Sequence, residues 1–230
     1  MFEDSLKKAL SGFGMEINEE QAKKMRLFYD FLIEINKVMN LTAITGEDES
    51  AVKHFADSLY LFKCAELKGK RILDIGSGAG FPGMPLLIYD PSLDITMLDS
   101  TQKRIDFRTD SRKMLGLGGS TVCARAEEYA LKAGAQFDIV TSRAVAPLNI
   151  LTELSMYFLK KGGLFMPMKS SAYEDELAQA QSAVKKMGGL FVKAVTYPLM
   201  PGLERSVFII QKADEGRKPR RYAQIVKKPL

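Results

Sequence analysis

The feature that most limits how this chain can fold is a glycine-rich turn directly after a short aliphatic run. The run Arg71–Ile75 is followed by Gly76, Gly78 and Gly80, and a helix is expected to begin near Gly83. Glycine is required where a backbone takes positive φ or passes close to a ligand. A strand, a tight turn and a helix in this order predict one unit of a parallel sheet covered by helices.

The pattern continues after this turn, because short β-rich runs alternate with helical segments, including 101–115, 149–158 and 174–187. We expect seven strands, at 71–75, 95–99, 121–123, 137–141, 164–168, 190–196 and 206–211. No helix separates the last two, so they can pair antiparallel. The chain of 230 residues therefore predicts one α/β domain with a doubly wound, Rossmann-like, mostly parallel sheet and one antiparallel strand.

The amino-terminal residues 1–65 predict a helical cap. Apolar residues recur at steps of three and four between 18 and 40, which is typical of one helix face, and Asn18 is the expected N-cap. A polar stretch at 45–50 should interrupt the helices, and a second helix should run through His54, Leu59 and Leu61 toward Gly69. We therefore divide the chain into a cap at 1–65, an α/β domain at 66–212 and a basic tail at 213–230.

The spacing of the glycines indicates which ligand the turn could hold. A nicotinamide-type loop has a third glycine where this chain has Phe81, and here Asp74 precedes the first glycine by two residues. A carboxylate suits a cationic ligand, and S-adenosylmethionine carries an ammonium and a sulfonium group. We predict that Asp74, Gly76 and Gly78 bind S-adenosylmethionine, with Asp74 holding its methionine end through water or backbone; the alternative is a tight strand–helix turn without a ligand.

A second acid supports a cofactor site. Asp99 ends the second expected strand, 25 residues after Asp74. In this topology an acid at that place accepts both hydrogens of a ribose diol. Two matched features favour a bound cofactor over a purely structural turn.

The charge of the chain is concentrated at its carboxyl end. Residues 212–230 hold seven of the 33 Lys and Arg and two of the 28 Asp and Glu, so this segment accounts for the whole net charge of +5. A neutral body with a basic arm points to a polyanionic partner such as nucleic acid. The alternative is a solubilising tail.

Several classes of protein are disfavoured by what the sequence holds. The two cysteines, Cys64 and Cys123, have no neighbouring Cys or His, so we expect neither a disulfide framework nor a metal site. No run resembles a signal peptide or a membrane span, which indicates a cytoplasmic protein without a membrane partner. His54 is the single histidine, so no nucleophilic triad is expected.

Further motifs resemble one family over nearly the whole chain, from about Phe28 to Leu230. They are the loop DIGSGAGFPGMP with LDSxxKR after it, NKVMNLTAI at 36–44, HFADS at 54–58, RAE at 125–127, SRAVA at 142–146, and Lys169. Together they resemble the bacterial rRNA small subunit methyltransferase G family, also called glucose-inhibited division protein B. The resemblance implies a class I methyltransferase that uses S-adenosylmethionine to methylate N7 of a single guanine in 16S ribosomal RNA, as naked RNA or within the small ribosomal subunit.

The resemblance also implies roles for residues on the cofactor side. Gly76 and Phe81 look like cofactor contacts, and Ala126 and Glu127 should face the adenine. Arg143 should lie where cofactor and substrate meet. For Phe81 we prefer packing beside the pocket over direct contact.

On the substrate side, guanine N7 has a lone pair and no proton, so its methylation needs no general base and we assign no catalytic residue. The expected substrate contacts are donors to the guanine, Arg143, Lys169 and Arg205; phosphate contacts, Lys103, Arg104 and Arg125; and two motif residues, Asn40 and His54. Surface Lys and Arg are often simply solvated. His54 is favoured as a packing or hydrogen-bonding residue, and Asn40 and Asp57 can be helix caps.

Two alternatives stay open at this point. A methyltransferase of this fold could act on a protein or a small molecule, and a non-catalytic RNA-binding protein could share the fold. Within the expected fifth strand, Pro167 cannot donate a ladder hydrogen bond, which puts the strand register beside Lys169 in doubt.

Overall fold

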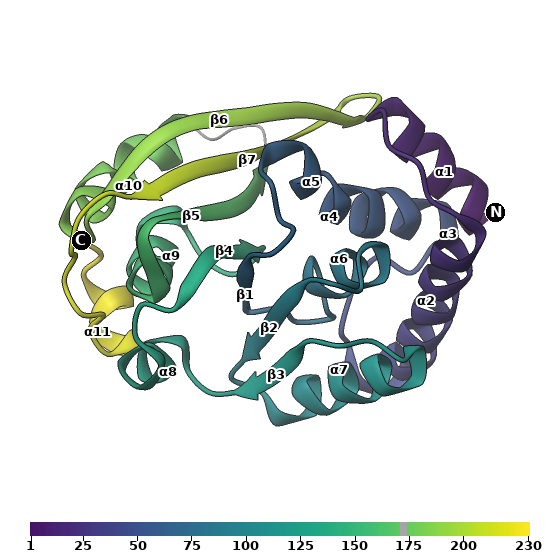
Figure 1. The fold of residues 1–230 in the computed structure, drawn as a ribbon, viewed down its shortest axis with the longest axis horizontal. Coiled ribbons are helices and arrows are strands. Elements are labelled where there is room, and N and C mark those ends of the chain that lie inside the picture. Colours follow the sequence, from purple (N-terminus) through teal and green to yellow (C-terminus); the bar gives the residue numbers. More distant parts are fainter. Residues whose placement is uncertain (171–173) are drawn as a thin grey trace.

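A computed structural model describes residues 1–170 and 174–230 as three layers, with a central sheet between two groups of helices (Figure 1). The strands are β1 Arg71–Ile75, β2 Asp94–Asp99, β3 Ser120–Cys123, β4 Phe137–Arg143, β5 Leu159–Ser170, β6 Gly189–Met200 and β7 Leu203–Lys212. Their order is β3-β2-β1-β4-β5-β7-β6. In Figure 1 the sheet runs from β6 at the top to β3 at the bottom.

The pairing confirms a mostly parallel sheet with one antiparallel strand. Strands β1 to β5 pair in parallel, and β7 lies antiparallel between β5 and β6. β5 and β6 are each 12 residues long, more than the runs expected from sequence. The expected loop before Gly202 is therefore mostly strand, and Pro201 and Gly202 make the turn between β6 and β7.

Pro167 leaves the register of β5 intact. It is the Cα partner of Ser142 in β4, and the neighbouring pairs follow without a shift. On the other side, the partners of Phe165 and Met168 in β7 also belong to one continuous register. The register leading to Lys169 is therefore regular.

The amino-terminal cap is helical, with bounds that differ in part from those expected. Its elements are α1 Phe2–Gly12, α2 Glu19–Met39, α3 Glu47–Ser50, the π-helix η1 Ala51–Ala56, α4 Asp57–Leu59 and α5 Leu61–Cys64. Asn18 is the N-cap of α2, in a reciprocal capping box with Gln21 whose two hydrogen bonds are each 2.8 Å. The acidic stretch at 47–50 begins a helix instead of interrupting one, because carboxylates stabilise a helix N-terminus. The last turn ends at Cys64, not near Gly69.

The remaining helices are α6 Gly83–Tyr89, α7 Gln102–Leu115, α8 Ala126–Ala133, α9 Leu148–Ser155, the 3-10 turn η2 Met156–Phe158, α10 Glu174–Lys186 and α11 Tyr222–Lys227. Strand side chains alternate between faces, so Ile72 joins the core under α1–α7, and Leu73 joins the core under α8–α10. Figure 1 shows the first group of helices to the right of the sheet and α8–α11 to the left. Within the described residues, no helix is both long and apolar enough to span a bilayer.

The basic tail is not the free arm that its charge suggests. Lys212 is buried and donates to the Met187 carbonyl oxygen at 2.7 Å, and the Arg217 amide donates to that of Lys186 at 3.3 Å. Farther on, Ile225 is fully buried against α9, and Leu230 packs on the second core. The tail therefore lies along the body and brings α11 to the carboxyl ends of the strands.

Candidate functional site

Two cavities lie at the carboxyl ends of the parallel strands, which is where ligands bind in open α/β sheets. The first, here called the β2 cavity, has a volume of about 330 Å³. Its lining comes from the ends of β1, β2 and β4, from α7, α8 and α9, and from the tail. The residues are Ile75, Gly76, Leu98, Asp99, Ser100, Arg104, Ala124, Arg125, Ala126, Glu127, Ala144, Val145, Leu154 and Tyr222. The sequence-predicted Gly76, Asp99, Ala126 and Glu127 are thus brought together.

The second, here called the β5 cavity, has a volume of about 420 Å³. It is lined by Ile44, Lys53, His54, Asp57, Arg143, Ala144, Met168, Lys169, Ser170, Glu176 and Arg205. Ala144 lines both cavities, so they adjoin at the end of β4. Its φ of 55° is unusual for a residue with a Cβ, and such strained positions cluster at functional sites.

The glycine-rich turn is held by its neighbours, and of its glycines Gly76 lines the β2 cavity whereas Gly78, also predicted to bind the cofactor, lines neither cavity. Gly76 has a φ of 67°, and a Cβ there would lie 2.6 Å from Val145 Cγ2. The amide of Gly78 donates to Asp99 Oδ2 at 3.1 Å, and its carbonyl oxygen accepts from the buried Arg108. Asp99 is 4% exposed and also accepts the Thr101 amide at 3.0 Å, so it fixes the turn from below.

Asp74 is not on either cavity. Its side chain is fully buried, and Oδ2 accepts the Gly83 amide at 3.0 Å, at the start of α6. Burial is the main reason that its pKa is raised to about 7. Asp74 therefore fastens the helix that follows the turn, and its expected hold on the cofactor through water or backbone stays a prediction.

Phe81 is a packing residue, as preferred from sequence. It is 4% exposed, lines neither cavity, and stacks on His54 with ring centroids 4.5 Å apart. The Arg143 guanidinium lies 5.0 Å from the centroid of the Phe81 ring. Phe81 thus packs against His54 and Arg143, which both line the β5 cavity.

Arg143 ties the end of β4 to the helical cap. Its Nη2 donates to His54 Nδ1 at 3.0 Å, and its Nη1 donates to the Lys53 carbonyl oxygen at 2.9 Å. Because arginine only donates, His54 Nδ1 is an acceptor, and Nε2–H donates to Thr42 Oγ1 at 2.8 Å. His54 is therefore neutral, and burial followed by the charge of Arg143 lowers its pKa to about 3. Both of its ring nitrogens are thus in hydrogen bonds, as favoured from the sequence.

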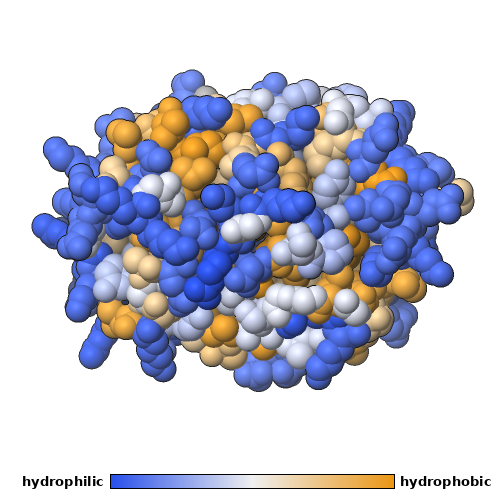
Figure 2. Space-filling view, in the orientation of Figure 1, coloured by the Kyte–Doolittle hydropathy of each residue, from blue (hydrophilic) through white to orange (hydrophobic). Residues whose placement is uncertain are grey.

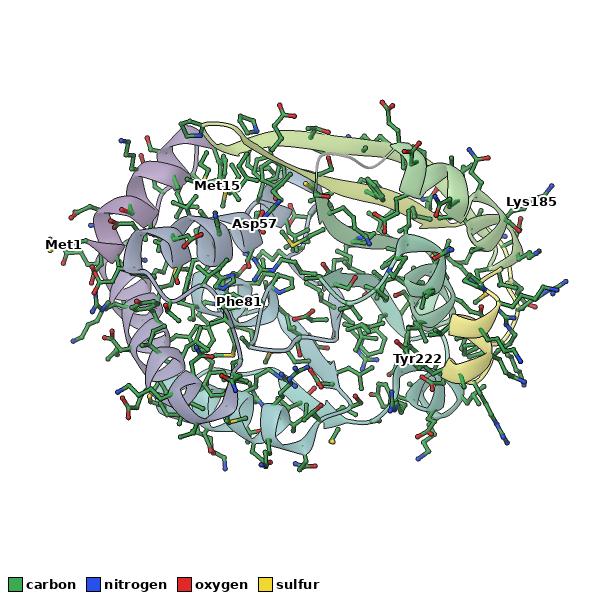
Figure 3. The ribbon with its side chains drawn as sticks, turned by 180° about the vertical axis from the view of Figure 1, so that it is seen from behind. Met1, Met15, Asp57, Phe81, Lys185 and Tyr222 are labelled. Atoms are coloured by element: carbon green, nitrogen blue, oxygen red, sulfur yellow. The ribbon has the colours of Figure 1, made fainter. Side chains whose placement is uncertain are left out.

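Asp57 completes this network beneath the cavity. Arg143 Nη1 donates to Asp57 Oδ2 at 3.1 Å, and Tyr197 of β6 donates its hydroxyl to Oδ1 at 2.7 Å. Asp57 is 2% exposed, and burial together with this carboxylate raises the pKa of Tyr197. Figure 3 shows Asp57 and Phe81 near the middle of the molecule, where the cap meets the sheet. Asp57, which could have been a helix-capping residue, is thus the ion-pair partner of Arg143.

Lys169 and Arg205 both line the β5 cavity, but only the side chain of Lys169 has hydrogen-bond partners among the described residues. Lys169 Nζ lies 2.6 Å from Glu176 Oε1 and 2.8 Å from the Ala146 carbonyl oxygen. Arg205, on β7, has no ion pair or side-chain hydrogen bond to any other described residue. Its guanidinium is therefore available to an incoming ligand.

The other predicted substrate contacts do not line the β5 cavity. Arg104 and Arg125 line the β2 cavity, and Lys103 lines a separate groove between α2 and α7. Asn40 is exposed, with a φ of 49°, and caps the carboxyl end of α2 by donating its amide to the Asn36 carbonyl oxygen. Asn40 is therefore a helix-capping residue, one of the two roles considered for it from the sequence.

Three residues with a place in the site escaped the sequence interpretation. Arg108, one helical turn after Arg104, is fully buried under the glycine turn with its Nη1 3.7 Å from Asp99 Oδ2. Thr42 belongs to the quoted NKVMNLTAI region, which was the available signal. Tyr222 lines the β2 cavity from the tail, and nothing in its local sequence indicated this.

Solved structures with a similar fold are described as several kinds of enzyme. The [4+2]-cyclase SpnF matches with a TM-score of 0.58 at 14% identity, covering 84% of this chain and 96% of the other. M. jannaschii TYW2 in complex with AdoMet matches with a TM-score of 0.53 at 14% identity, covering 68% and 76%. Likeness at this level shows the fold alone, because one fold hosts unrelated reactions.

Sequence relatives are much closer. "Ribosomal RNA small subunit methyltransferase G" of Lactococcus lactis subsp. lactis is 39% identical, over all of both chains. The protein of the same name from Lachnoclostridium phytofermentans is 43% identical over 96% of this chain and 93% of its own. The family model for rRNA small subunit methyltransferase G matches residues 21–199. The chain is therefore a member of the rRNA small subunit methyltransferase G family.

Proposed function

We propose that this protein transfers the methyl group of S-adenosylmethionine to N7 of a single guanine in 16S ribosomal RNA. The proposal rests on family membership and on two adjoining cavities that share Ala144. A cofactor in the β2 cavity and a base in the β5 cavity would meet at that residue. This is the arrangement that a direct transfer between two bound molecules requires.

The β2 cavity fits S-adenosylmethionine in size and chemistry. Its volume of about 330 Å³ lies within the range of small-molecule sites. Asp99 at the end of β2 would accept the ribose hydroxyls, and Leu98, Ala126 and Leu154 give apolar surface for the adenine. When bound, S-adenosylmethionine supplies an electrophilic methyl group.

The observation that best supports N7 as the acceptor is that the acidic side chains and the histidine of the β5 cavity are already in hydrogen bonds. Asp57 is bound by Arg143 and Tyr197, and Glu176 by Lys169 and the Leu148 amide. His54 Nδ1 is taken by Arg143. His54 Nδ1 and both oxygens of Asp57 are therefore occupied, and Glu176 is held through Oε1. Guanine N7 needs no general base, because it carries no proton.

Positioning and charge are what the chain can contribute to this reaction. Arg205 lines the β5 cavity without a partner among the described residues, so it can donate to guanine O6 or to a neighbouring phosphate. A donor at O6 also orients the base as its ring becomes cationic. The base must be splayed from a loop, because the A-form major groove hides N7.

The test is methylation of 16S RNA from cells that lack the gene. The purified protein is incubated with radiolabelled S-adenosylmethionine and either naked RNA or isolated small subunits, and N7-methylguanine is mapped by cleavage at the modified base. We expect one modified guanine, and the two substrates separate RNA from an assembled particle. Methyl transfer to protein, or to another atom of the RNA, would contradict the proposal.

A binding measurement separates the enzyme from a non-catalytic RNA-binding protein of the same fold. Calorimetric titration with S-adenosylhomocysteine should show one site per chain. An Arg205→Gln variant should keep this affinity and lose methylation rate, because the change lies on the β5 cavity alone. If the chain binds RNA but neither cofactor nor product, the catalytic assignment is wrong.

A further inference from the structure

We propose that the carboxyl-terminal segment 219–225 is part of the cofactor site, and that its docking and the binding of S-adenosylmethionine reinforce each other. Tyr222 is the residue through which this occurs. This inference rests on the proposed function, since it takes the β2 cavity as the cofactor site. The carboxyl-terminal segment would then help to bind the cofactor of the α/β domain, besides being a charged extension.

Tyr222 closes one side of the β2 cavity together with two residues near its expected adenine end. Its amide donates to Glu127 Oε1 at 3.2 Å, and the Arg125 guanidinium lies 5.6 Å from its ring centroid. All three residues line the cavity. Figure 3 shows Tyr222 on the side of α11 that faces the rest of the molecule. Tyr222 is 39% exposed, so part of its ring remains free for a ligand.

The segment is anchored immediately before Tyr222. Arg220 makes three hydrogen bonds to the Glu153 carboxylate, from its backbone amide at 3.0 Å, from Nε at 2.8 Å and from Nη2 at 2.6 Å. Glu153 is 1% exposed, so this is a charge pair shielded from water on one side. The pair fixes where α11 begins, because Arg221 is its N-cap residue.

An apolar contact after Tyr222 links the segment to the cavity a second time. Ile225 is fully buried in a cluster with Ile150, Leu154 and Ala126. Leu154 and Ala126 also line the β2 cavity. Displacement of the tail would therefore open the cavity at Tyr222 and also loosen two other lining residues.

The chemistry of Tyr222 suits a purine nucleoside. An aromatic ring can stack on adenine, and such stacking changes affinity by between about 5-fold and about 150-fold when the ring is removed. The phenyl ring supplies this contact, so the hydroxyl group is dispensable. If the docked tail tightens binding by a given factor, bound ligand must stabilise the docked tail by the same factor.

The experiment uses the full chain and S-adenosylhomocysteine as the probe. Titration calorimetry compares the wild type with Tyr222→Ala, Tyr222→Phe and Arg220→Gln. Lys218→Ala serves as the matched control, because Lys218 is an exposed tail cation with no ion pair or side-chain hydrogen bond to another described residue. We expect binding about 5-fold or more weaker for Tyr222→Ala and Arg220→Gln. Tyr222→Phe and Lys218→Ala should bind as the wild type does. Circular dichroism and thermal unfolding establish that each variant folds.

Amide hydrogen exchange supplies the reciprocal measurement. In the wild type, saturating S-adenosylhomocysteine should slow exchange in 219–225, by a factor that matches the loss of affinity in Arg220→Gln. Unchanged exchange, or a Tyr222→Ala dissociation constant within about twofold of that of the wild type, would overturn the inference while leaving the cofactor site standing. A wild type that binds no S-adenosylhomocysteine would instead overturn the proposed function, and with it this inference.

Discussion

Buried charges at the site differ in how many hydrogen bonds they make, and Asp74 keeps one carboxylate oxygen without a partner among the described residues. Its Oδ2 accepts one amide, and its Oδ1 has no hydrogen-bond partner among the described residues. A carboxylate in such surroundings favours the protonated form. The acid before the glycine turn is therefore a structural residue whose charge is costly at neutral pH.

Asp74→Asn should change how stability depends on pH. The folded state holds the Asp74 proton up to a pKa of about 7, whereas the unfolded chain releases it near ~3.9, so Asp74 lowers the free energy of unfolding as pH rises from about 4 to about 7. Relative to the wild type, the variant should gain up to about 4 kcal/mol across this window. Urea unfolding of both proteins at pH 4.5, 6 and 7.5 measures the difference. A difference that does not change with pH would contradict the assigned pKa.

Tyr197→Phe should destabilise the protein without weakening cofactor binding. The change leaves Asp57 Oδ1 buried and without its donor, which costs about 1–3 kcal/mol. Tyr197 lines neither cavity, so affinity for S-adenosylhomocysteine should be unchanged. Tyr157→Phe, at a half-buried tyrosine, is the control in urea unfolding. Equal losses in the two variants would mean that the Asp57 hydrogen bond contributes nothing.

Sequence separation decides which of these contacts could be foreseen. The Asn18–Gln21 capping box spans three residues and follows from helix-start chemistry. The Tyr197–Asp57 bond spans 140 residues, and a tyrosine near a strand end carries no mark of it. The buried carboxylates were visible as residue types, but their partners depend on the packing of the cap against the sheet.

Among the helices and strands, the π-helix η1 is the hardest to predict from sequence, although it supplies several of the groups that hold Arg143. It carries Lys53 and His54 and leads directly into Asp57, and all three bond to Arg143. The wider turn of a π-helix is a tertiary adjustment, often found at functional sites, and apolar spacing does not reveal it. By contrast, β1, the glycine turn and β2 follow from local patterns and were predicted within a residue or so.

The contact between the glycine turn and the segment after β4 can be tested directly. A Cβ on Gly76 would lie 2.6 Å from Val145 Cγ2, so Gly76→Ala should lower the free energy of unfolding by about 1–3 kcal/mol beyond its backbone strain. Val145→Ala removes the obstructing atoms and should restore that part in the double variant. A double-mutant cycle in urea unfolding gives the coupling.

Gly116→Ala is the matched control for this cycle. Gly116 has a similar φ of 62°, and an added Cβ would meet nothing within 4 Å, so the variant measures backbone strain alone, about 1–2 kcal/mol. Its effect should simply add to that of Val145→Ala. If Gly76→Ala is equally additive, close packing between the turn and Val145 is not why glycine is needed there.

For the whole molecule, the distribution of charge misled the sequence interpretation in one respect. The basic segment 212–230 resembles a solvated arm, yet Lys212, at the end of β7, is buried and Arg220 is paired with Glu153. Besides Arg221, the N-cap residue of α11, four exposed cations remain in this segment, Arg217, Lys218, Lys227 and Lys228. Figure 2 shows hydrophilic side chains projecting from the left rim, where Figure 1 places α10, α11 and the carboxyl end.

A variant with these four residues changed to glutamine should bind RNA less tightly and with a weaker salt dependence. Removing one cation from a phosphate reduces the slope of log affinity against log salt by roughly 0.7, so the slope should fall by up to about 2.8. Affinity for S-adenosylhomocysteine should not change, because Arg220 and Tyr222 are retained. Filter binding to 16S RNA over a series of salt concentrations measures the slope. An unchanged slope would mean that the docked tail serves the cofactor cavity and does not touch RNA.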